Sequence, residues 1–196
     1  MLGLVASMGF LYPMSRLVKS LVEEKELRLK ETLQILGVKP WAYSLSWVIV
    51  ASIVFLLGSV FVSLVLHINV MSHSSLGYLF ALFALFCSAV MGFSFFVAAF
   101  FSKAKLAAIM GPISLFVTIV PYWIFFGTNS YEESKGKIFA SLLPCTALSF
   151  GANILAEFES AEIGVHSWNA SQGTYSFNTC LGMLALDTIV YFFFRL

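Results

Sequence analysis

The residue types that most often form metal or catalytic sites are few in this sequence and far apart. They are three histidines and three cysteines: His67, His73, His166, Cys87, Cys145 and Cys180. The cysteines have no C-x-x-C spacing, and the histidines fall in separate polar segments, so we expect no metal site. A disulfide between Cys145 and Cys180 would need an oxidising compartment, and the sequence leaves this pairing open.

A single acidic residue, Asp187, lies within a long apolar run near the C-terminal end. An unpaired charge inside a membrane helix costs about 2.5–3.5 kcal/mol, so Asp187 is expected to face protein or water. An ionisable group in this position is a candidate functional residue by default. A hydrogen bond to another helix, or a basic partner elsewhere, explains it equally well, and these interpretations stay open.

The other charges concentrate in the stretch EEKELRLKETLQILGVKP, residues 23–40. The sequence as a whole is 60% hydrophobic and 11% charged, whereas a soluble domain has about 45–50% and about 25%. So few polar residues cannot cover 21 phenylalanines in water. The composition therefore predicts an integral membrane protein, and a net charge of +1 gives no reason to expect a nucleic-acid partner.

Four long apolar runs predict transmembrane helices, at residues 43–66, 77–101, 106–126 and 179–196. Each approaches or exceeds the roughly 20 residues that cross a bilayer. Residues 1–14 are too short to span alone, and we expect them to be the end of a truncated helix. The resulting fold is an all-α polytopic bundle of about five transmembrane segments. Pro112 and Pro121 are expected to bend the run 106–126.

Basic residues predict the orientation of these spans. All but two of the 11 lysines and arginines fall on one side. The two exceptions are Lys135 and Lys137. By the positive-inside rule, residues 15–40 are cytoplasmic, and residues 67–76 and 127–178 are outside or lumenal. On that outer side Asn169 begins an Asn-Ala-Ser triplet, a candidate glycosylation site.

Residues 15–40 predict an amphipathic cytoplasmic helix. No helix breaker occurs from Ser15 to Leu36, and Gly37 followed by Pro40 is a typical helix end. The residues alone leave open whether this helix anchors the topology at the lipid interface or docks a cytoplasmic partner. Its mixed charges favour a protein partner over anionic lipid.

Small residues in the run 77–101 predict close helix packing. Ala84, Ser88 and Gly92 recur at intervals of four, which places them on one face.

The outer segment 127–178 is too long to be a simple connection. Within it, LLPCTALSFGANILAEF (residues 142–158) is apolar but short, and Pro144 and Gly151 interrupt it. We expect a helical hairpin or re-entrant segment that dips in from outside. The following GVHSWNASQGTYSF (residues 164–177) is turn-rich, and we expect it to be exposed.

Two blocks of the sequence carry a family resemblance. YPMSRLVKSLVEEKELRLKETLQILGV (residues 12–38) resembles the segment after the second transmembrane helix in the A subfamily of ATP-binding cassette (ABC) transporters, the lipid exporters. LLPCTALSFGANILAEFE (142–159) and SFNTCLGMLALDTIVYFFF (176–194) are similar to the outer loop and sixth helix of that family. The resemblance implies that residues 1–196 form a single partial ABC-2 type transmembrane domain, from the second to the sixth helix. The sequence contains no G-x-x-x-x-G-K-[ST] phosphate loop.

The resemblance implies a role for the charged helix, which in the family rests on the nucleotide-binding domain. The implied contact residues are Glu31, Gln34, Gly37, Val38 and Lys39, with Lys103 in the short loop 102–105. The implied partners are a fused or separate nucleotide-binding domain, a second transmembrane half and membrane lipids. ATP and Mg would bind to the nucleotide-binding domain, so we expect no cofactor and no enzyme activity on this chain.

The sequence thus favours the membrane-spanning part of an ATP-driven transporter of lipids or other amphiphiles, in the plasma membrane or an internal membrane. One alternative is an ABC-2 type permease subunit with a separate ATPase, and another is a non-transporting remnant. An intramembrane enzyme is the least favoured, since Asp187 is the only candidate group at membrane depth.

Overall fold

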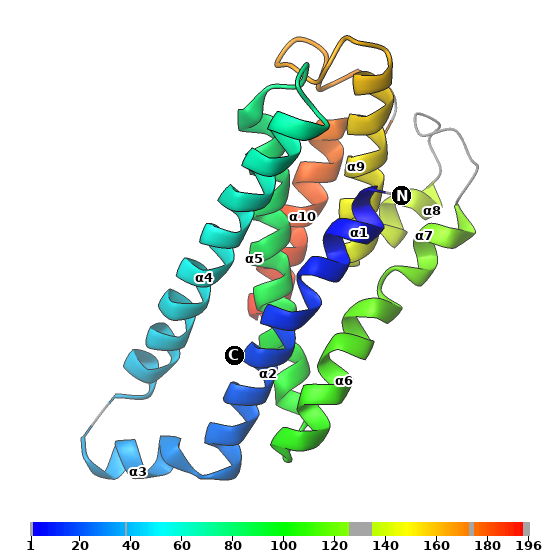
Figure 1. Ribbon diagram of the computed structural model, residues 1–196. Coiled ribbons are helices and arrows are strands. Elements are labelled where there is room, and N and C mark those ends of the chain that lie inside the picture. Colours follow the sequence, from blue (N-terminus) through cyan, green and yellow to red (C-terminus); the bar gives the residue numbers. More distant parts are fainter. Residues whose placement is uncertain (1, 38, 126–134, 173–174, 194–196) are drawn as a thin grey trace.

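The computed structural model is a bundle of helices with loops gathered at its two ends (Figure 1). It describes residues 2–37, 39–125, 135–172 and 175–193, and within these ranges it contains helices and no strands. The helices are α1 (Leu2–Gly9), α2 (Leu11–Glu26), α3 (Leu29–Ile35), α4 (Pro40–Asn69), α5 (Leu76–Phe100), α6 (Ala104–Val117), α7 (Val120–Ile124), α8 (Lys135–Ala140), α9 (Pro144–Ser160) and α10 (Phe177–Phe193).

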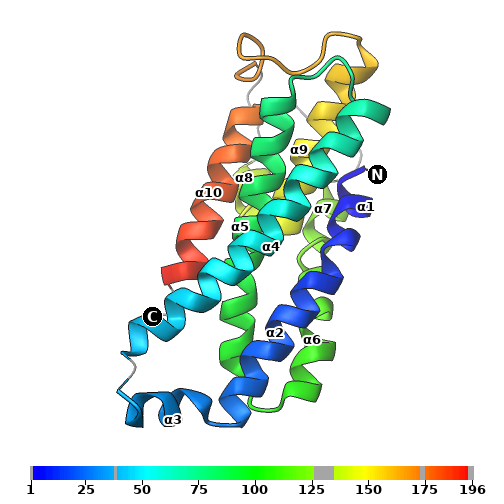
Figure 2. The same cartoon turned by 60° about the vertical axis from the view of Figure 1, so that its left-hand side comes forward.

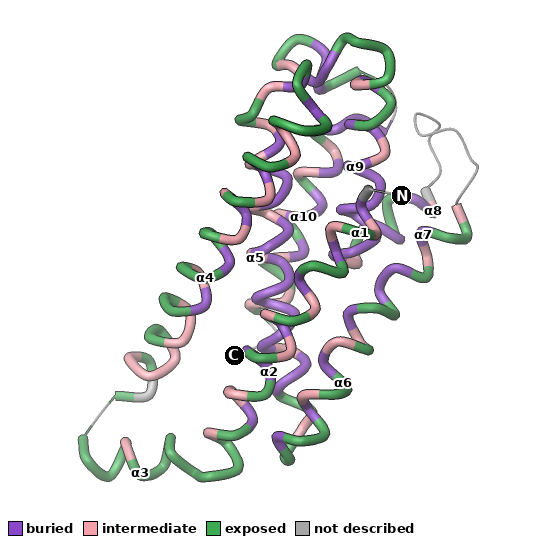
Figure 3. Tube along the Cα trace, viewed as in Figure 1, coloured by how far each residue is buried: buried purple, intermediate pink, exposed green. Residues whose placement is uncertain are grey.

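The helix α5 is the core of the bundle. It packs against α4, α2, α9 and α10, and most of its length is buried (Figure 3). A helix that is hydrophobic on every side is suited to such a central position. Fully buried side chains such as Leu82, Phe83 and Phe86 fill the space between α5 and its neighbours.

The helix α4, in contrast, leaves most of its apolar side chains uncovered (Figure 3). Three described helical stretches are long and apolar enough to cross a membrane: Trp41–Asn69, Leu76–Phe100 and Ala104–Ile124. The helix α10 is apolar but shorter, at 17 residues. Exposed residues such as Ile53, Leu57 and Phe61 on α4 are stable in this arrangement because lipid tails, not water, surround them.

The apolar run 106–126 is divided into two helices. The helix α6 ends at Val117 and α7 begins at Val120, with Pro121 in its first turn, where the missing N–H group of proline is tolerated. Pro112 lies inside α6, which continues past it. The interruption therefore occurs beside Pro121 and not at Pro112.

The prediction of an unbroken helix from Ser15 to Leu36 is wrong. Residues 11–26 form α2, which packs inside the bundle against α5 and α6, with Met14, Val18 and Val22 buried. The chain then turns at Arg28, whose φ of 52° is left-handed, and α3 runs across the end of the bundle (Figures 1 and 2). Periodicity could not reveal the turn, because both helices keep an amphipathic pattern through it.

The two ends of the bundle hold different segments. We call the end that carries α3 and the α5–α6 turn the α3 end, and the end that carries the α4–α5 loop and residues 161–172 the opposite end (Figure 2). This arrangement is the one that alternating spans require. Residues 27–37 and 102–105, which were expected on the cytoplasmic side, lie together at the α3 end, whereas residues 15–26, which were expected there too, run along the bundle as α2.

The apolar stretch 142–158 is not divided into a hairpin: it forms the single helix α9, with Pro144 in its first turn and Gly151 in its interior. The helix α9 is largely buried against α1, α5 and α10. The exposure expected for residues 164–177 is wrong in part, because Val165, Asn169 and Tyr175 are buried. Gly164, with φ of 65°, lies so close to the α4–α5 loop that a Cβ there would overlap the carbonyl oxygen of His73. This segment therefore folds back onto the bundle.

Candidate functional site

The helix α3 forms an exposed surface at its end of the bundle. No residue of α3 is buried. Two large apolar side chains at its C-terminal end are the most open, with Ile35 87% and Leu36 74% exposed. Because they lie beside charged residues and not in a lipid-facing helix, they are suited to contact with another protein. We call residues 27–37 and 39 the α3 surface.

The residues expected to contact a partner lie on or near this surface. Glu31, Gln34, Gly37 and Lys39 are all exposed, and Gly37 adopts φ of 87°, which ends α3 in the left-handed conformation that glycine favours. Val38 lies outside the described residues. Lys103 is exposed in the α5–α6 turn at the same end of the bundle.

A polar groove of about 790 Å³ connects Lys103 with the α3 surface. Its lining comes from the last turns of α2 and the first turn of α6, and consists of Lys19, Glu23, Glu26, Leu27, Lys103, Ala104, Lys105 and Leu106. The structure thus brings together two segments that are far apart in the sequence.

Three consecutive charged residues at the end of α2 hold this region in place, and sequence reasoning missed them. The Nζ of Lys25 donates to the carbonyl oxygens of Ala99 (3.0 Å) and Phe101 (3.1 Å). Glu26 Oε2 accepts from the backbone N–H of Ala104 at 2.9 Å.

Glu24, the first of these three residues, accepts hydrogen bonds from α4. Its carboxylate accepts from the hydroxyl of Tyr43 and from Trp47 Nε1, the latter at 2.6 Å. The spacing of Tyr43 and Trp47, one helical turn apart, was the available signal.

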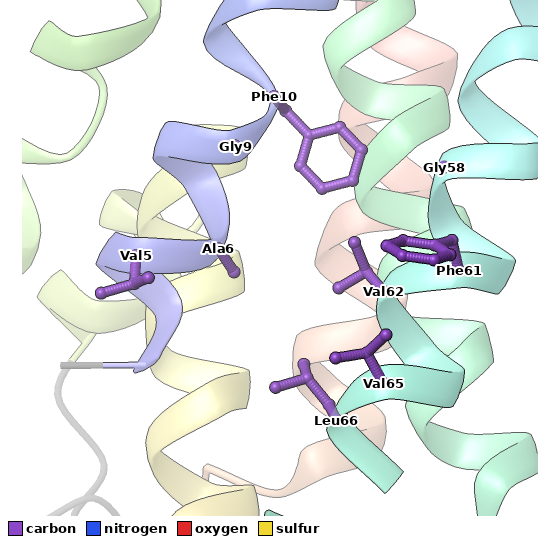
Figure 4. A pocket seen from close by; sticks show the side chains of 9 residues that line it. All are labelled: Val5, Ala6, Gly9, Phe10, Gly58, Phe61, Val62, Val65 and Leu66. Atoms are coloured by element: carbon purple, nitrogen blue, oxygen red, sulfur yellow. The ribbon is translucent and has the colours of Figure 1, made fainter. Parts of the chain in front are cut away.

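An apolar groove of about 610 Å³ lies between α1 and α4, nearer the opposite end (Figure 4). Its nine lining residues are Val5, Ala6, Gly9, Phe10, Gly58, Phe61, Val62, Val65 and Leu66. Phe10 points from the junction of α1 and α2 into the space between the helices, and Val62 and Leu66 point into it from α4 (Figure 4). With small residues such as Gly9 and Gly58 in its walls, the groove is open and suited to a hydrocarbon chain.

Comparison with known proteins agrees with this architecture. Residues 1–195 match the family described as ABC-2 family transporter protein. The chain belongs to this family. As an ABC-2 membrane domain with long apolar helices, it is a multi-pass integral membrane protein.

The relatives of this ABC-2 domain include human transporters of the A subfamily, as the resemblance implied. The chain is 28% identical to human Phospholipid-transporting ATPase ABCA3, over 97% of this chain and 12% of that protein. It is 31% identical to human Phospholipid-transporting ATPase ABCA7, over 97% and 9%. It is also 31% identical to human Retinal-specific phospholipid-transporting ATPase ABCA4, over 94% and 8%. The chain spans about a tenth of the length of these relatives.

The small residues of α5 in this ABC-2 domain lie at helix contacts. Ser88 Oγ is 2.9 Å from Thr188 Oγ1 of α10. A Cβ on Gly92 would be 3.0 Å from Tyr191 Cβ of the same helix. Ala84 lines, together with Ser88, a recess of about 160 Å³ beside α4. The stripe therefore serves two contacts, with α10 and with α4.

Asp187 lies on α10 and is only 1% exposed. Within the described part of the chain, neither of its carboxylate oxygens has a hydrogen-bond partner. It faces protein and lines neither of the grooves described above. The geometry gives it no assigned role in a transport path.

Two further expectations concern the opposite end of this ABC-2 domain. Asn169 is 1% exposed, and its side chain donates to the carbonyl oxygen of Gly164 and accepts from the N–H of His166, both at 2.7 Å. It therefore braces the loop, and a glycan could be attached only before or without this folding. Cys87, Cys145 and Cys180 are free and buried in this structure, so Cys145 and Cys180 do not form a disulfide here.

The structure also bears on metal binding. Among the described residues, no group of three or more His, Cys, Asp or Glu side chains could hold a metal ion.

Proposed function

We propose that this ABC-2 domain is the membrane-spanning part of an ATP-driven transporter of lipids or other amphiphiles, and that the α3 surface docks on a nucleotide-binding domain. The observation that carries the proposal is the position of Ile35 and Leu36, two open apolar side chains on a charged surface outside the apolar spans. The three relatives are named phospholipid-transporting ATPases, which supports both ATP and a lipid substrate.

Docking would follow the usual anatomy of a protein interface. Ile35 and Leu36 would be the apolar centre, and Glu31, Gln34 and Lys39 would be part of the polar rim. Lys103, across the polar groove, would be a second contact. ATP and Mg would be bound by the nucleotide-binding domain, whose movement α3 would receive.

The apolar groove between α1 and α4 supports a lipid as the transported molecule. Its lining offers hydrocarbon and aromatic surface and no charged side chain. An acyl chain in this groove would be held by van der Waals contacts with the side chains of both helices, which are individually small and collectively large. A second transmembrane half would complete the path.

Polar substitution of the apolar centre tests the docking. In the complete transporter reconstituted in liposomes, the variant Ile35→Asp/Leu36→Asp should lower lipid transport by about tenfold or more, since loss of a central contact costs about 2 kcal/mol or more. Ile163→Asp is the matched control, because Ile163 is also an exposed apolar residue but lies at the opposite end. Transport at the wild-type rate in the α3 variant, with normal amounts in the membrane, would exclude the docking role.

The size of the native polypeptide distinguishes a fused nucleotide-binding domain from a separate ATPase subunit. A denaturing blot of native membranes, with an antibody against residues 164–178, should show a band several times larger than 21.7 kDa if the nucleotide-binding domain is fused to this chain. A band near 21.7 kDa would instead favour an ABC-2 permease subunit with a separate ATPase.

A further inference from the structure

The α5–α6 turn is held on both of its arms by adjacent residues of α2. The carbonyl groups at the end of a helix lack intrahelical partners and carry partial negative charge, which suits the ammonium of Lys25 on Ala99 and Phe101. The N–H groups at the start of a helix have the opposite need, which the carboxylate of Glu26 meets at Ala104. Neither arm of the turn can therefore move independently of the end of α2.

The contact of Glu24 with α4 closes a ring around α3. The chain runs from α2 through α3 to α4, and Glu24 joins α2 directly to Tyr43 and Trp47, in the first two turns of α4. Each of these bonds has an ionised partner, which makes it about twice as strong as a neutral hydrogen bond. The two residues of the segment with positive φ angles, Arg28 and Gly37, both lie inside this ring.

We propose that Glu24, Lys25 and Glu26, here called the α2 hub, are positioning residues that transmit a displacement of α3 to α4, α5 and α6 together. Without the hub, rotation at Arg28 and Gly37 would absorb a push on α3. With it, the ends of three membrane helices must follow the end of α2. This inference rests on the proposed docking of α3, which supplies the displacement.

Paired substitutions in the complete transporter test the hub. Lys25→Met removes the donor and keeps the apolar stem, whereas Lys25→Arg keeps a donor. Glu26→Ala removes the acceptor of the Ala104 N–H group, whereas Glu26→Gln keeps a carbonyl oxygen for it. The matched control is Arg16→Met, since Arg16 is an exposed charged residue of the same helix that is neither a hub residue nor part of the groove lining.

The readout is the number of lipids transported per ATP hydrolysed, measured in the same liposomes and per mole of inserted transporter. We expect Lys25→Met and Glu26→Ala to lower this ratio by about fivefold or more, in the range of measured coupling between sites. Lys25→Arg and Glu26→Gln should restore most of it, and Arg16→Met should leave it unchanged. A merely structural role would change the amount of inserted protein and not this ratio.

A cross-link separates failure of the hub from failure of the docking. Gln34→Cys places a thiol on the α3 surface, where a short bifunctional reagent should join it to the nucleotide-binding domain in the wild-type background and in every hub variant. Absence of the cross-link in the wild-type background would refute the docking itself. If the cross-link forms but Lys25→Met and Glu26→Ala keep the wild-type ratio, or if the conservative variants are as impaired as these two, the hub proposal is overturned.

Discussion

Replacement of Gly92 by alanine should weaken the contact between α5 and α10. The added Cβ would lie 3.0 Å from Tyr191 Cβ and 3.4 Å from Phe192 Cδ2. Tyr191 Cβ is attached directly to the backbone of α10, so rotation of the side chain cannot remove this overlap. The two helices would have to separate by a few tenths of an ångström along their contact.

The size of the effect follows from a comparison with a second glycine. Gly182, within α10, has no atom within 4 Å of its hypothetical Cβ. Alanine is favoured over glycine in a helix interior by about 1 kcal/mol, and this gain applies to both positions. Overpacking costs about 1–3 kcal/mol and applies only to Gly92. Gly92→Ala should therefore be less stable than Gly182→Ala by about 1–3 kcal/mol.

Unfolding in mixed detergent micelles measures this difference. The two variants are titrated with SDS under identical conditions and followed by tryptophan fluorescence, and the midpoints are converted to free energies of unfolding. Equal stability of Gly92→Ala and Gly182→Ala would refute the reasoning, because it would mean that α5 and α10 do not approach each other as closely as the structure has them.

Three further predictions concern buried polar groups. Asn169→Ala should lower the free energy of unfolding by about 1–3 kcal/mol, since two backbone groups lose their hydrogen-bond partner. Faster proteolysis of the loop at residues 164–172 would report this loss, and an unchanged rate would contradict the bracing role. Asp187→Asn should leave stability unchanged or raise it, because no described group donates to the carboxylate; a loss in the SDS titration would reveal a basic partner. Burial raises the pKa of Tyr175, so its contribution to stability is complete below about pH 10 and is lost as the pH rises further. Tyr175→Phe should thus flatten the alkaline decline in stability, and an unchanged pH profile would count against the burial.

Composition and hydropathy were sufficient for the fold class. A chain with 60% hydrophobic and 11% charged residues has too few polar side chains to cover its apolar ones in water. Apolar runs long enough to cross a bilayer must be helical, because their backbone groups have no water with which to form hydrogen bonds. The runs 43–66 and 77–101 accordingly lie within or almost within α4 and α5. The family resemblance added the order of the segments, because its two blocks lie at the two ends of the chain.

Local sequence was insufficient where partners distant in the chain decide the structure. Residues 15–36 have an unbroken helical pattern. Long-range contacts such as the packing of Val18 against Gly111 and the hydrogen bond from Ser15 to Ala108 place α2 in the bundle, whereas no residue of α3 is buried. Asn169 looked like an exposed acceptor for a glycan, but its segment folds onto the distant α4–α5 loop, where the N–H of Val165 donates to Ser74 Oγ. Neither outcome is encoded in nearby residues.

The sequence by itself determined that the chain spans a membrane, that its charges gather at one end, and that it belongs to a transporter family. The tertiary structure alone decided what those charges do. Glu24, Lys25 and Glu26 are consecutive in the sequence, but their partners lie at Tyr43 and Trp47, at Ala99 and Phe101, and at Ala104. The physical reason is that solvation depends on composition and can be read locally, whereas a hydrogen bond depends on which helix ends meet in space.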